Sequence, residues 1–521
     1  MAIKISKLSL ILFLALLLRS WQIAKLPSLN PDEAALGYNA YSLIQTGKDE
    51  HGASWPLHFM SFGDYKPGGY VYLALPFVKI LGLTPLAVRL PNLIFSVLTI
   101  YVLYRLVFLL TTNYLLSYLA AFVLAVNPWH LQFSRGAWES STALFFILLG
   151  IYWLYLYLIN NQKKYIYLFP LPLVVALSIY HSARIIAPVL LLIILFLNFK
   201  KLFNKEFLIA VIIGLILVTP VGISFLKNGG TTRFGGVGLT ADKGPLSRSE
   251  ELLNQHANTF IVNRLLHNRR VLYAFSWVEK YTSHFNLNFL FITGDEVPRS
   301  KNPDMGQLYL IELPFLLLGI LMLLKSKNIH LKQFTFSFLI IAPLASSLTF
   351  QAPSALRALP MVIPLSIFVA LGLQQIITFS QKYNLIKLFI YSLLTISYLF
   401  SMSYYLDSYY VHAPKRYSFA WNSGFSDIVP YIESQKNNYQ NIYLTDKYDQ
   451  PYILYLFYSR YLPSKIQSQI KLTPPDKFGF STVRQIDNIH FGISESISPN
   501  SLIIDAADFE KTGQSFRIYT N

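Results

Sequence analysis

The chain has 521 residues, of which 54% are hydrophobic and only 13% are charged, and its mean hydropathy is +0.42. Soluble domains carry roughly 25% charged residues, so this composition excludes an ordinary soluble protein and predicts an α-helical polytopic membrane protein. The formal net charge of +17 does not indicate nucleic-acid binding, because the basic residues are dispersed between apolar segments. The absence of cysteine excludes disulfides and thiolate metal sites.

Apolar runs of near 20 residues predict about eleven transmembrane spans. They cover residues 8–26, 88–110, 114–129, 140–159, 166–180, 184–198, 207–225, 308–324, 334–350, 358–379 and 385–404. No small-residue cleavage site follows the first run, so we expect it to be an uncleaved span and not a signal peptide.

The lysines between these runs predict the orientation of the chain in the bilayer. They form four groups, namely Lys163 and Lys164; Lys200, Lys201 and Lys205; Lys325, Lys327 and Lys332; and Lys382 and Lys387. All four groups fall on one side, which the positive-inside rule makes cytoplasmic. We therefore expect a cytoplasmic amino terminus, an extracytoplasmic carboxyl terminus and a multi-pass protein of a plasma membrane, with a prokaryotic one favoured.

The apolar rhythm also predicts two domains. Residues 1–404 form the transmembrane domain, with a first external loop at 27–87 and a long one at 226–307. Helix-like stretches at 32–46 and 68–81 are expected at the membrane interface. Residues 405–521 are expected to form a small extracytoplasmic α/β domain, because β-like runs at 441–445, 478–483 and 501–504 alternate with helix-like stretches at 426–436 and 450–460.

The motif Asn30-Pro31-Asp32-Glu33 begins the first external helix-like stretch. Asn30 is a suitable N-cap, Pro31 suits the first helical position, and Glu33 stands where a capping box places its acid. Glu33 therefore has a structural interpretation of equal weight to a catalytic one. Asp32 is expected to act as a general base at the membrane surface, although an acid also stabilises a first helical turn.

Basic residues recur at the same external edge. Lys66 lies in Asp64-Tyr65-Lys66-Pro67, Arg89 precedes Pro91, and Arg357 lies at the outer end of the tenth span. Interfacial anchoring is the ordinary role of such side chains. The alternative role is to bind a lipid phosphate.

Arg135 and Glu139 are four residues apart, so on a helix they could form a local ion pair. Trp129, His130 and Trp138 surround them, and aromatic residues beside charges suit sugar binding. His181 and Arg184 repeat this pattern at the next external turn. No set of histidines and acids has metal-ligand spacing, so no cofactor is implied, although a divalent metal is compatible with the sequence.

At these residues the chain resembles the GT-C glycosyltransferases of family 39, the group of protein O-mannosyltransferases and aminoarabinose lipid A transferases. The resemblance covers most of residues 1–400 and is strongest at 31–105 and 127–146. It matches the family's Asp-Glu pair with Asp32-Glu33, its Arg-Leu-Pro motif with Arg89-Leu90-Pro91, and its Lys-Pro-Pro motif with Lys66-Pro67. Gly68 replaces the second proline of the last motif.

The resemblance implies a set of site residues. Asp32, Glu33 and Glu139 are expected to be catalytic, and Lys66, Arg89 and Arg357 to bind the donor phosphate. From their position at the external edge, and not from a family motif, the expected substrate contacts are Asp64, Tyr65, Arg135, His181 and Arg184. The resemblance also implies an inverting transfer of one sugar, a hexose or pentose, from a polyprenyl-phosphate carrier to a hydroxyl acceptor on the extracytoplasmic face. The sequence does not identify the acceptor.

Two other functions are compatible with the pattern. The first is an oligosaccharyltransferase or glycan ligase that transfers a preassembled glycan. The second is a transporter or flippase for lipid-linked sugars, although transporters place ionisable residues near the bilayer midplane. Because most candidates here lie at the external edge, chemistry at the membrane surface is favoured.

Overall fold

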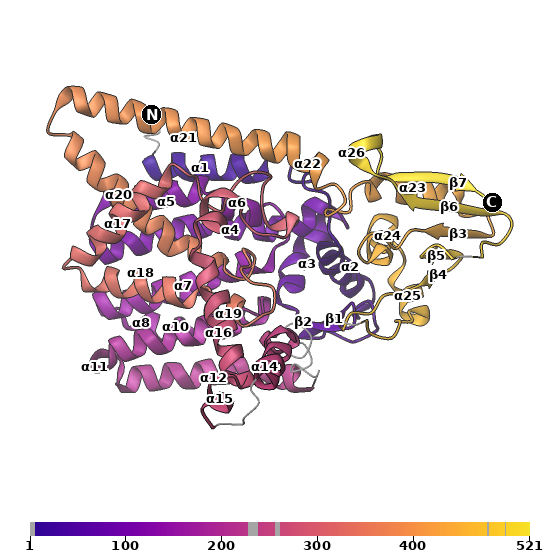
Figure 1. Cartoon of the computed structure of the whole chain (residues 1–521), viewed down its shortest axis with the longest axis horizontal. Helices are drawn as coiled ribbons and strands as arrows, with labels where there is room; N and C mark the ends of the chain where they lie inside the picture. Colours follow the sequence, from indigo (N-terminus) through magenta and orange to yellow (C-terminus); the bar gives the residue numbers. More distant parts are fainter. Residues whose placement is uncertain (1–5, 228–237, 256–260, 477–478, 495) are drawn as a thin grey trace.

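The computed structural model describes residues 6–227, 238–255, 261–476, 479–494 and 496–521. A bundle of helices forms one end of the molecule, and the carboxyl-terminal residues form a smaller part with a sheet at the other end (Figure 1). The helices α2 (Pro31–Thr46) and α3 (Gly69–Leu81) lie between these two parts.

Within these residues, six helical stretches are long and apolar enough to cross a bilayer, and the count is seven if the bent pair α5 (Tyr114–Val126) and α6 (Pro128–Ser134) is one span. Three of the six are α4 (Pro85–Thr111), α7 (Glu139–Asn160) and α12 (Lys205–Lys227). The others are α18 (Ile329–Ile341) with α19 (Leu344–Ser347), η5 (Leu359–Met361) with α20 (Val362–Ser380), and the stretch Asn384–Arg416, which begins with α21 (Asn384–Asp407). The fold is that of a multi-pass membrane protein.

The remaining predicted spans are occupied by shorter helices. These are α1 (Lys7–Ser20), α8 (Lys163–Leu168), α9 (Pro170–Ile179), α10 (Ala183–Leu197) and α17 (Glu312–Lys325), with α11 (Phe199–Leu202) in the loop after α10. The 14 residues of α1 extend over about 21 Å at the α-helical rise, less than the ~30 Å of a hydrocarbon core. Helix length alone therefore supports fewer spans than the eleven predicted.

Helices α17 and α20 approach each other closely, and glycine makes this approach possible. A Cβ atom at Gly319 would overlap the carbonyl oxygen of Phe368, and one at Gly372 would overlap that of Phe315. Small residues at such crossings let two backbones touch, which strengthens packing where lipid removes the hydrophobic driving force.

The two helices predicted for residues 27–87 are confirmed, since α2 and α3 coincide with 32–46 and 68–81. Between them lies a hairpin that was not predicted, made of β1 (His58–Ser61) and β2 (Asp64–Pro67). The strands are antiparallel, with Phe59 opposite Lys66 and Ser61 opposite Asp64. The hairpin therefore brings the Lys66 strand back toward α2.

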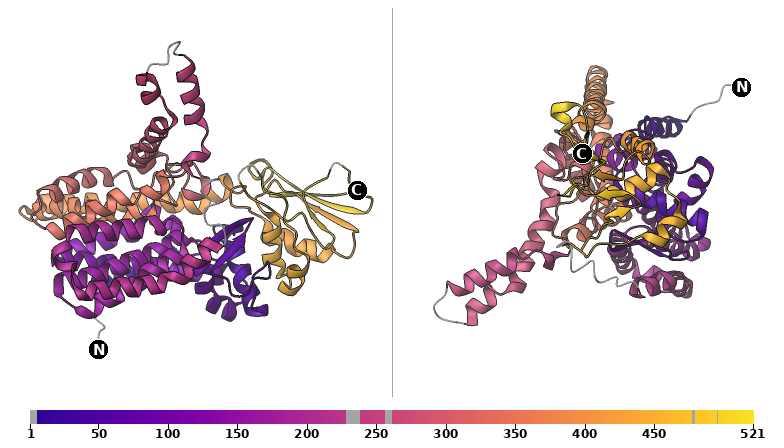
Figure 2. Two further views of the ribbon diagram at one scale, coloured as in Figure 1. Left: turned by 90° about the horizontal axis from the view of Figure 1, so that it is seen from below. Right: turned by 90° about the vertical axis from the view of Figure 1, so that its right-hand side faces the viewer.

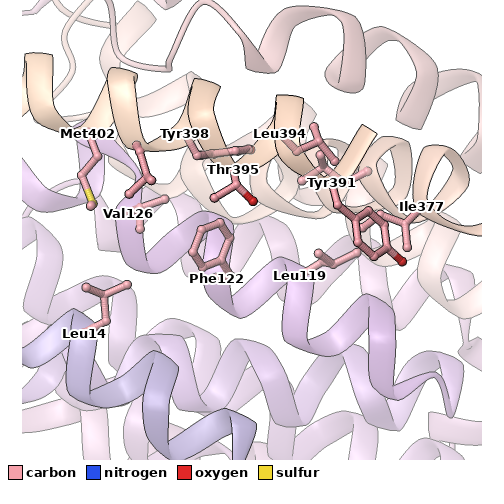
Figure 3. Close-up of a pocket in the computed structure, with 12 residues that line it drawn as sticks. Leu14, Leu119, Phe122, Val126, Ile377, Tyr391, Leu394, Thr395, Tyr398 and Met402 are labelled. Carbon is pink, nitrogen blue, oxygen red and sulfur yellow. The ribbon is translucent and has the colours of Figure 1, made fainter. Parts of the chain in front are cut away.

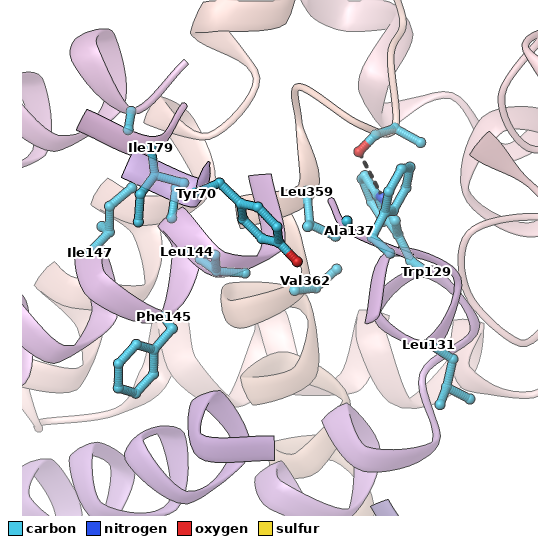
Figure 4. Packing of buried hydrophobic residues seen from close by; sticks show 14 of the residues in the cluster. Tyr70, Trp129, Leu131, Ala137, Leu144, Phe145, Ile147, Ile179, Leu359 and Val362 are labelled. Atoms are coloured by element: carbon cyan, nitrogen blue, oxygen red, sulfur yellow. Dashed lines mark hydrogen bonds between the residues drawn. The ribbon is translucent and has the colours of Figure 1, made fainter. Parts of the chain in front are cut away.

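A buried core holds the turn that precedes α7. Trp129 donates its Nε1–H to the carbonyl of Ala355 at 2.9 Å (Figure 4). Asn92 of α4 donates to the carbonyls of Phe133 and Gly136, each at 2.7 Å. These bonds cross three segments and fix the position of Glu139, the first residue of α7.

An apolar groove of about 580 Å³ lies between α5, α20 and α21, with Leu14 of α1 at one end (Figure 3). Phe122 and Val126 form one wall, and Tyr398 and Met402 form part of the opposite wall. Such a groove between spans suits a hydrocarbon chain, because nearly all of its lining is apolar.

After α21 the chain continues through η6 (Ser408–His412) and α22 (Ala413–Arg416) into a mixed sheet with the strand order β4-β5-β3-β6-β7. The strands are β3 (Asn441–Leu444), β4 (Gln485–Ile486), β5 (Ile489–Phe491), β6 (Ser501–Ala506) and β7 (Phe516–Thr520), and the helices are α23 (Phe425–Gln435), α24 (Pro451–Ser459), α25 (Pro463–Gln469) and α26 (Phe509–Thr512). Central β3 pairs in parallel with β5 and β6.

Of the predicted run 478–483, residues 479–483 form only an isolated bridge through Val483, and residue 478 lies outside the described residues.

The long segment before α17 contains further helices. They are η1 (Leu239–Ala241), α14 (Gly244–Asn254), α15 (Ile261–Leu266), α16 (Arg269–Thr282), η2 (Ser283–Phe285), η3 (Asn288–Ile292) and η4 (Pro298–Ser300). Parts of the predicted loop 226–307, namely 228–237 and 256–260, lie outside the described residues.

Candidate active site

The amino-terminal end of α2 has the predicted cap. Asn30 Oδ1 accepts from the backbone N–H of Glu33 at 3.0 Å, and Glu33 Oε2 accepts from the backbone N–H of Asn30 at 3.2 Å. Pro31 occupies the first turn. The capping box is thus confirmed, and it holds Asp32 at the start of the helix with its side chain 49% exposed.

Glu33 is also the buried partner of Arg89. Arg89 donates from Nε to Oε1 and from Nη2 to Oε2, each at 2.8 Å, and the backbone N–H of Ala137 donates to Oε1 at 2.7 Å. Arg89 additionally donates to the carbonyls of Ile23 and Pro27 at 2.7 and 2.9 Å. A buried ion pair is retained only when its hydrogen bonds are satisfied, and this one joins α2, α4 and the turn before α7.

This geometry bears on two expectations. Glu33 was expected to be catalytic and Arg89 to bind the donor phosphate, whereas in this structure both side chains are buried and engaged with each other. The sequence had left the structural interpretation of Glu33 open, and the capping box together with the Arg89 pair supports it.

Lys66 lies against Asp32. Its Nζ is 2.5 Å from Asp32 Oδ1, and it sits 4.8 Å from the ring centre of Phe62. Asp32 and Lys66 line a common recess with Glu139, which we call the Asp32 pocket. Its lining residues are Asp32, Ala35, Leu36, Asn39, Phe59, Ser61, Lys66, Pro67, Val71 and Glu139. The fold therefore brings together three predicted site residues from α2, β2 and α7.

The departure from the Lys-Pro-Pro motif has a structural reason. Gly68 donates its backbone N–H to the carbonyl of Leu57 at 2.9 Å, and proline has no such donor. A Cβ atom at this position would lie 2.5 Å from the ring of Phe59, too close for a real contact. Glycine lets the hairpin close behind Lys66.

Asp64 and Tyr65 lie beside Lys66 on β2 but are not among the lining residues of the Asp32 pocket. Successive strand residues face opposite sides, so Tyr65 is directed away from Lys66 and is 36% exposed. Their predicted contact with substrate has no support in the geometry of the pocket.

Arg135 is buried away from the pocket. It donates to the carbonyls of Leu18 and Trp21 at 2.8 and 2.6 Å and stacks on Tyr409 and Tyr410 at 4.8 and 5.1 Å. The guanidinium thus connects α6 to the end of α1 and to η6, and the expected contact of Arg135 with substrate has no support in this geometry.

Arg184 and Arg357 also lie outside the lining of the Asp32 pocket. Arg184 donates from Nη2 to His58 Nε2 at 2.7 Å and so contacts β1. His181 lies in the turn before α10. Arg357 donates to Thr349 Oγ1 and to the carbonyl of Gln351, both at 3.3 Å, in the loop that follows α19. The pocket geometry does not support phosphate binding by Arg357.

Two acids missed by the sequence reasoning lie close to the Asp32 pocket. Glu50 is fully buried behind Asn39, whose side chain accepts the Glu50 backbone N–H at 3.0 Å and donates to Oε1 at 3.4 Å. Burial raises the pKa of Glu50 to about 8. No local signal could have revealed it, because Asp49-Glu50-His51 reads as a polar turn.

Asp449 comes from the carboxyl-terminal part of the chain. It lies just before α24, which packs on α2. Tyr38 of α2 donates to the carbonyl of Tyr461, which follows α24, at 2.9 Å. Desolvation by the surrounding residues raises the pKa of Asp449, and the negative charge of Asp32 raises it further. Because Lys66 and Arg299 act on the same carboxylate in the opposite sense, Asp449 belongs to the electrostatic environment of the pocket.

Among the described residues, no group of three or more histidines and acids is arranged to hold a metal ion.

Comparison with known proteins finds similarity to one family model and to solved structures. Residues 66–223 match the family model of the dolichyl-phosphate-mannose-protein mannosyltransferases. The structure resembles the oligosaccharyltransferase AglB from Archaeoglobus fulgidus, solved with an inhibitory peptide and a dolichol-phosphate, with a TM-score of 0.51, 14% identity, and coverage of 88% of this chain and 63% of that chain. It also resembles ArnT from Cupriavidus metallidurans bound to undecaprenyl phosphate, with a TM-score of 0.51, 11% identity, and coverage of 90% and 86%. A search of curated sequences found no match.

The family match and the two structural likenesses identify the fold as that of the GT-C glycosyltransferases. The predicted resemblance is confirmed at this level. The chain spans less than two thirds of the archaeal oligosaccharyltransferase that it matches.

Proposed function

We propose that the protein is an inverting glycosyltransferase that moves one sugar from a polyprenyl-phosphate carrier to a hydroxyl acceptor. The observation that carries the proposal is the convergence of Asp32, Lys66 and Glu139 on one pocket, with Lys66 Nζ 2.5 Å from Asp32 Oδ1. A carboxylate and a cation side by side provide what this reaction needs, a base for the incoming hydroxyl and a positive charge for the departing phosphate.

In the proposed reaction the acceptor oxygen attacks the anomeric carbon of the donor sugar. The bond between that carbon and the phosphate oxygen breaks, and its electron pair stays on the phosphate. Asp32 accepts the proton of the attacking hydroxyl, and a single displacement inverts the anomeric configuration. The protein contributes mainly orientation and electrostatic stabilisation, because the carrier already supplies an activated carbon.

The Asp32–Lys66 pair suggests how the pocket changes when donor arrives. A phosphate offers Lys66 an anionic partner that competes with Asp32. Donor binding would then loosen the ion pair and leave the carboxylate available to accept a proton. Glu139, the first residue of α7, would help to orient the acceptor hydroxyl from the other wall of the pocket.

The relatives support a lipid-linked donor, because one was solved with a dolichol-phosphate and the other with undecaprenyl phosphate. The membrane topology belongs to the same proposal. We propose about eleven spans, with the short helices α1, α9, α10 and α17 among them, a cytoplasmic amino terminus, and the pocket and residues 405–521 on the extracytoplasmic side. In support, α2, the hairpin and the sheet all lie at one end of the bundle (Figure 1).

The proposal is tested by incubating purified protein with a panel of radiolabelled polyprenyl-phosphate monosaccharides and scoring sugar release or transfer. Wild-type protein should consume at least one donor, and Asp32→Asn should not. If no donor is consumed and the purified protein instead moves lipid-linked sugar across a vesicle bilayer, the flippase alternative replaces this proposal.

A further inference from the structure

A helical extension projects from the bundle at the end that carries α2 and the hairpin (Figure 1). We call it the arm; it comprises the described residues 238–255 and 261–285, with α14, α15 and α16. In both views of Figure 2 it extends sideways, across the direction in which the spans run. An element that leaves the spans in this direction runs along the plane of the bilayer.

The base of the arm is fixed to the end of a span. Trp277 donates from Nε1 to Ser347 Oγ at 3.1 Å, and Tyr281 donates to the carbonyl of Ile340 at 2.9 Å. The loop that follows α19 reaches Trp129 through the carbonyl of Ala355, so this is the same end of the bundle as Glu139. The arm therefore begins at the level of the membrane surface.

The helix α16 has one packed side and one open apolar side. On the packed side, Tyr273 donates to the carbonyl of Asp242 at 2.9 Å and Lys280 lies 3.0 Å from its carboxylate. The open side carries Phe275 and Val278, which are 66% and 48% exposed. Together with the half-buried Val271 they follow the spacing i, i+4 and i+7, which aligns residues along one face of a helix.

Further apolar side chains are exposed at the tip, where α15 presents Ile261, Leu265 and Leu266 at 76%, 63% and 56%. Basic residues lie among them, since Arg264, Arg269 and Arg270 are all exposed. An apolar stripe flanked by arginines and interfacial aromatic residues is the pattern of a helix that lies in the headgroup region and is attracted by anionic lipids.

We propose that the arm binds the anionic lipid surface at the end of the bundle that carries the Asp32 pocket, with Val271, Phe275 and Val278 turned into the acyl boundary and the arginines at lipid phosphates. The bilayer that surrounds the spans is already at the level of the arm's base, so the occupant of the apolar stripe is the lipid next to the bundle. The proposal does not depend on the transfer reaction.

The absence of cysteine permits a direct test in the full-length protein. Single variants Phe275→Cys and Val278→Cys carry a nitroxide label in vesicles that contain phosphatidylglycerol, and power saturation compares collisions with oxygen and with a water-soluble nickel complex. Leu215→Cys, on the exposed side of α12, gives the value for lipid, and Ser434→Cys, exposed on α23, gives the value for water.

At Phe275 and Val278 we expect nickel accessibility about threefold or more below that at Ser434, as for a buried interfacial face. Replacing Arg264, Arg269 and Arg270 with glutamine in the Phe275→Cys protein should raise the nickel accessibility at position 275. Nickel accessibility equal to that at Ser434 overturns the proposal. Low accessibility with spin–spin broadening that disappears on dilution with unlabelled protein also overturns it, because a second copy then covers the stripe.

Discussion

Lys66 Nζ lies 2.5 Å from Asp32 Oδ1, although 34 residues separate the two in the chain. The pair is open to solvent, with Asp32 49% and Lys66 18% exposed, whereas the adjacent Glu33–Arg89 pair is buried. An accessible ion pair can exchange partners with a ligand, and a buried, fully hydrogen-bonded pair cannot do so without losing stability. In the proposed function the Asp32–Lys66 pair takes part in the reaction, and the Glu33–Arg89 pair holds the end of α2 in place.

Asp32→Asn should abolish transfer without affecting folding. The amide keeps the shape of the side chain but cannot accept the proton, so turnover should fall about 100- to 10,000-fold. The measurement is the rate of sugar transfer from a donor that wild-type protein consumes. The matched control is Asp64→Asn, on the hairpin that carries Lys66, which should stay near the wild-type rate. Wild-type turnover by Asp32→Asn would remove Asp32 from the role of base.

Lys66→Ala should weaken donor use more than acceptor use. Loss of the cation beside the departing phosphate is expected to cost about 100- to 1000-fold in rate, and Lys66→Arg should recover part of it. Steady-state kinetics with donor and acceptor varied separately would show a larger change in kcat/KM for the donor. Unchanged donor kinetics in Lys66→Ala would show that another group receives the phosphate.

Arg89→Met should destabilise the protein severely. It leaves the Glu33 carboxylate buried without its charged partner, which is expected to cost about 3–5 kcal/mol. Thermal unfolding in detergent measures the change. The double variant Arg89→Met with Glu33→Gln should unfold at a higher temperature than Arg89→Met alone, and an equal or lower temperature would contradict the view that the pair is structural.

Glu50 should make stability fall with rising pH. Its pKa is about 8 in the folded protein and 4.5 in an unperturbed chain, so its contribution is present below pH 4.5 and is lost as the pH rises through 8. His51 acts oppositely at lower pH, because burial lowers its pKa from 6.5 to about 4. Between pH 6.5 and 8 the effect of Glu50 is therefore no longer opposed by that of His51.

Glu50→Gln should remove that loss. In wild-type protein the free energy of unfolding should fall between pH 6.5 and 8, by at most about 1.4 kcal/mol per pH unit from this one group. The thermal midpoint should fall over the same pH range. In the variant the curve should be flatter over the same window. Parallel curves for the two proteins would show that Glu50 ionises normally in the folded state.

Asp449→Asn should shift the pH dependence of transfer. Asp32 and Asp449 are close enough for the charge of Asp32 to raise the pKa of Asp449, and the interaction is reciprocal. Removing the carboxylate at 449 should make Asp32 easier to ionise, so the acidic limb of the pH–rate profile should move to lower pH. The matched control is Asp446→Asn, because Asp446 lies on the same loop as Asp449 but forms an exposed pair with Arg484. Identical shifts of the pH–rate profile in both variants would indicate a general charge effect.

Several features of the fold could be read from short stretches of sequence. The apolar runs predicted the helices of the bundle, and Asn30-Pro31-Asp32-Glu33 predicted a capping box that is present. The number of spans was harder to predict, because α9 and α10 contain 10 and 15 residues and helix length alone does not decide whether they cross the bilayer. The hairpin that carries Lys66 was missed, since its strands have four residues each.

The sequence by itself determined the class of fold, the cap on α2 and the residue types at the membrane edge, because these depend on hydrophobicity and hydrogen bonding within a few positions. Only the tertiary structure decided which charged residues meet: Asp32 with Lys66 and Glu139 at an open pocket, and Glu33 with Arg89 in a buried pair. It also brought Asp449 to the pocket by packing α24 on α2. Contacts between distant segments depend on how helices and strands pack, and local sequence patterns do not encode that packing.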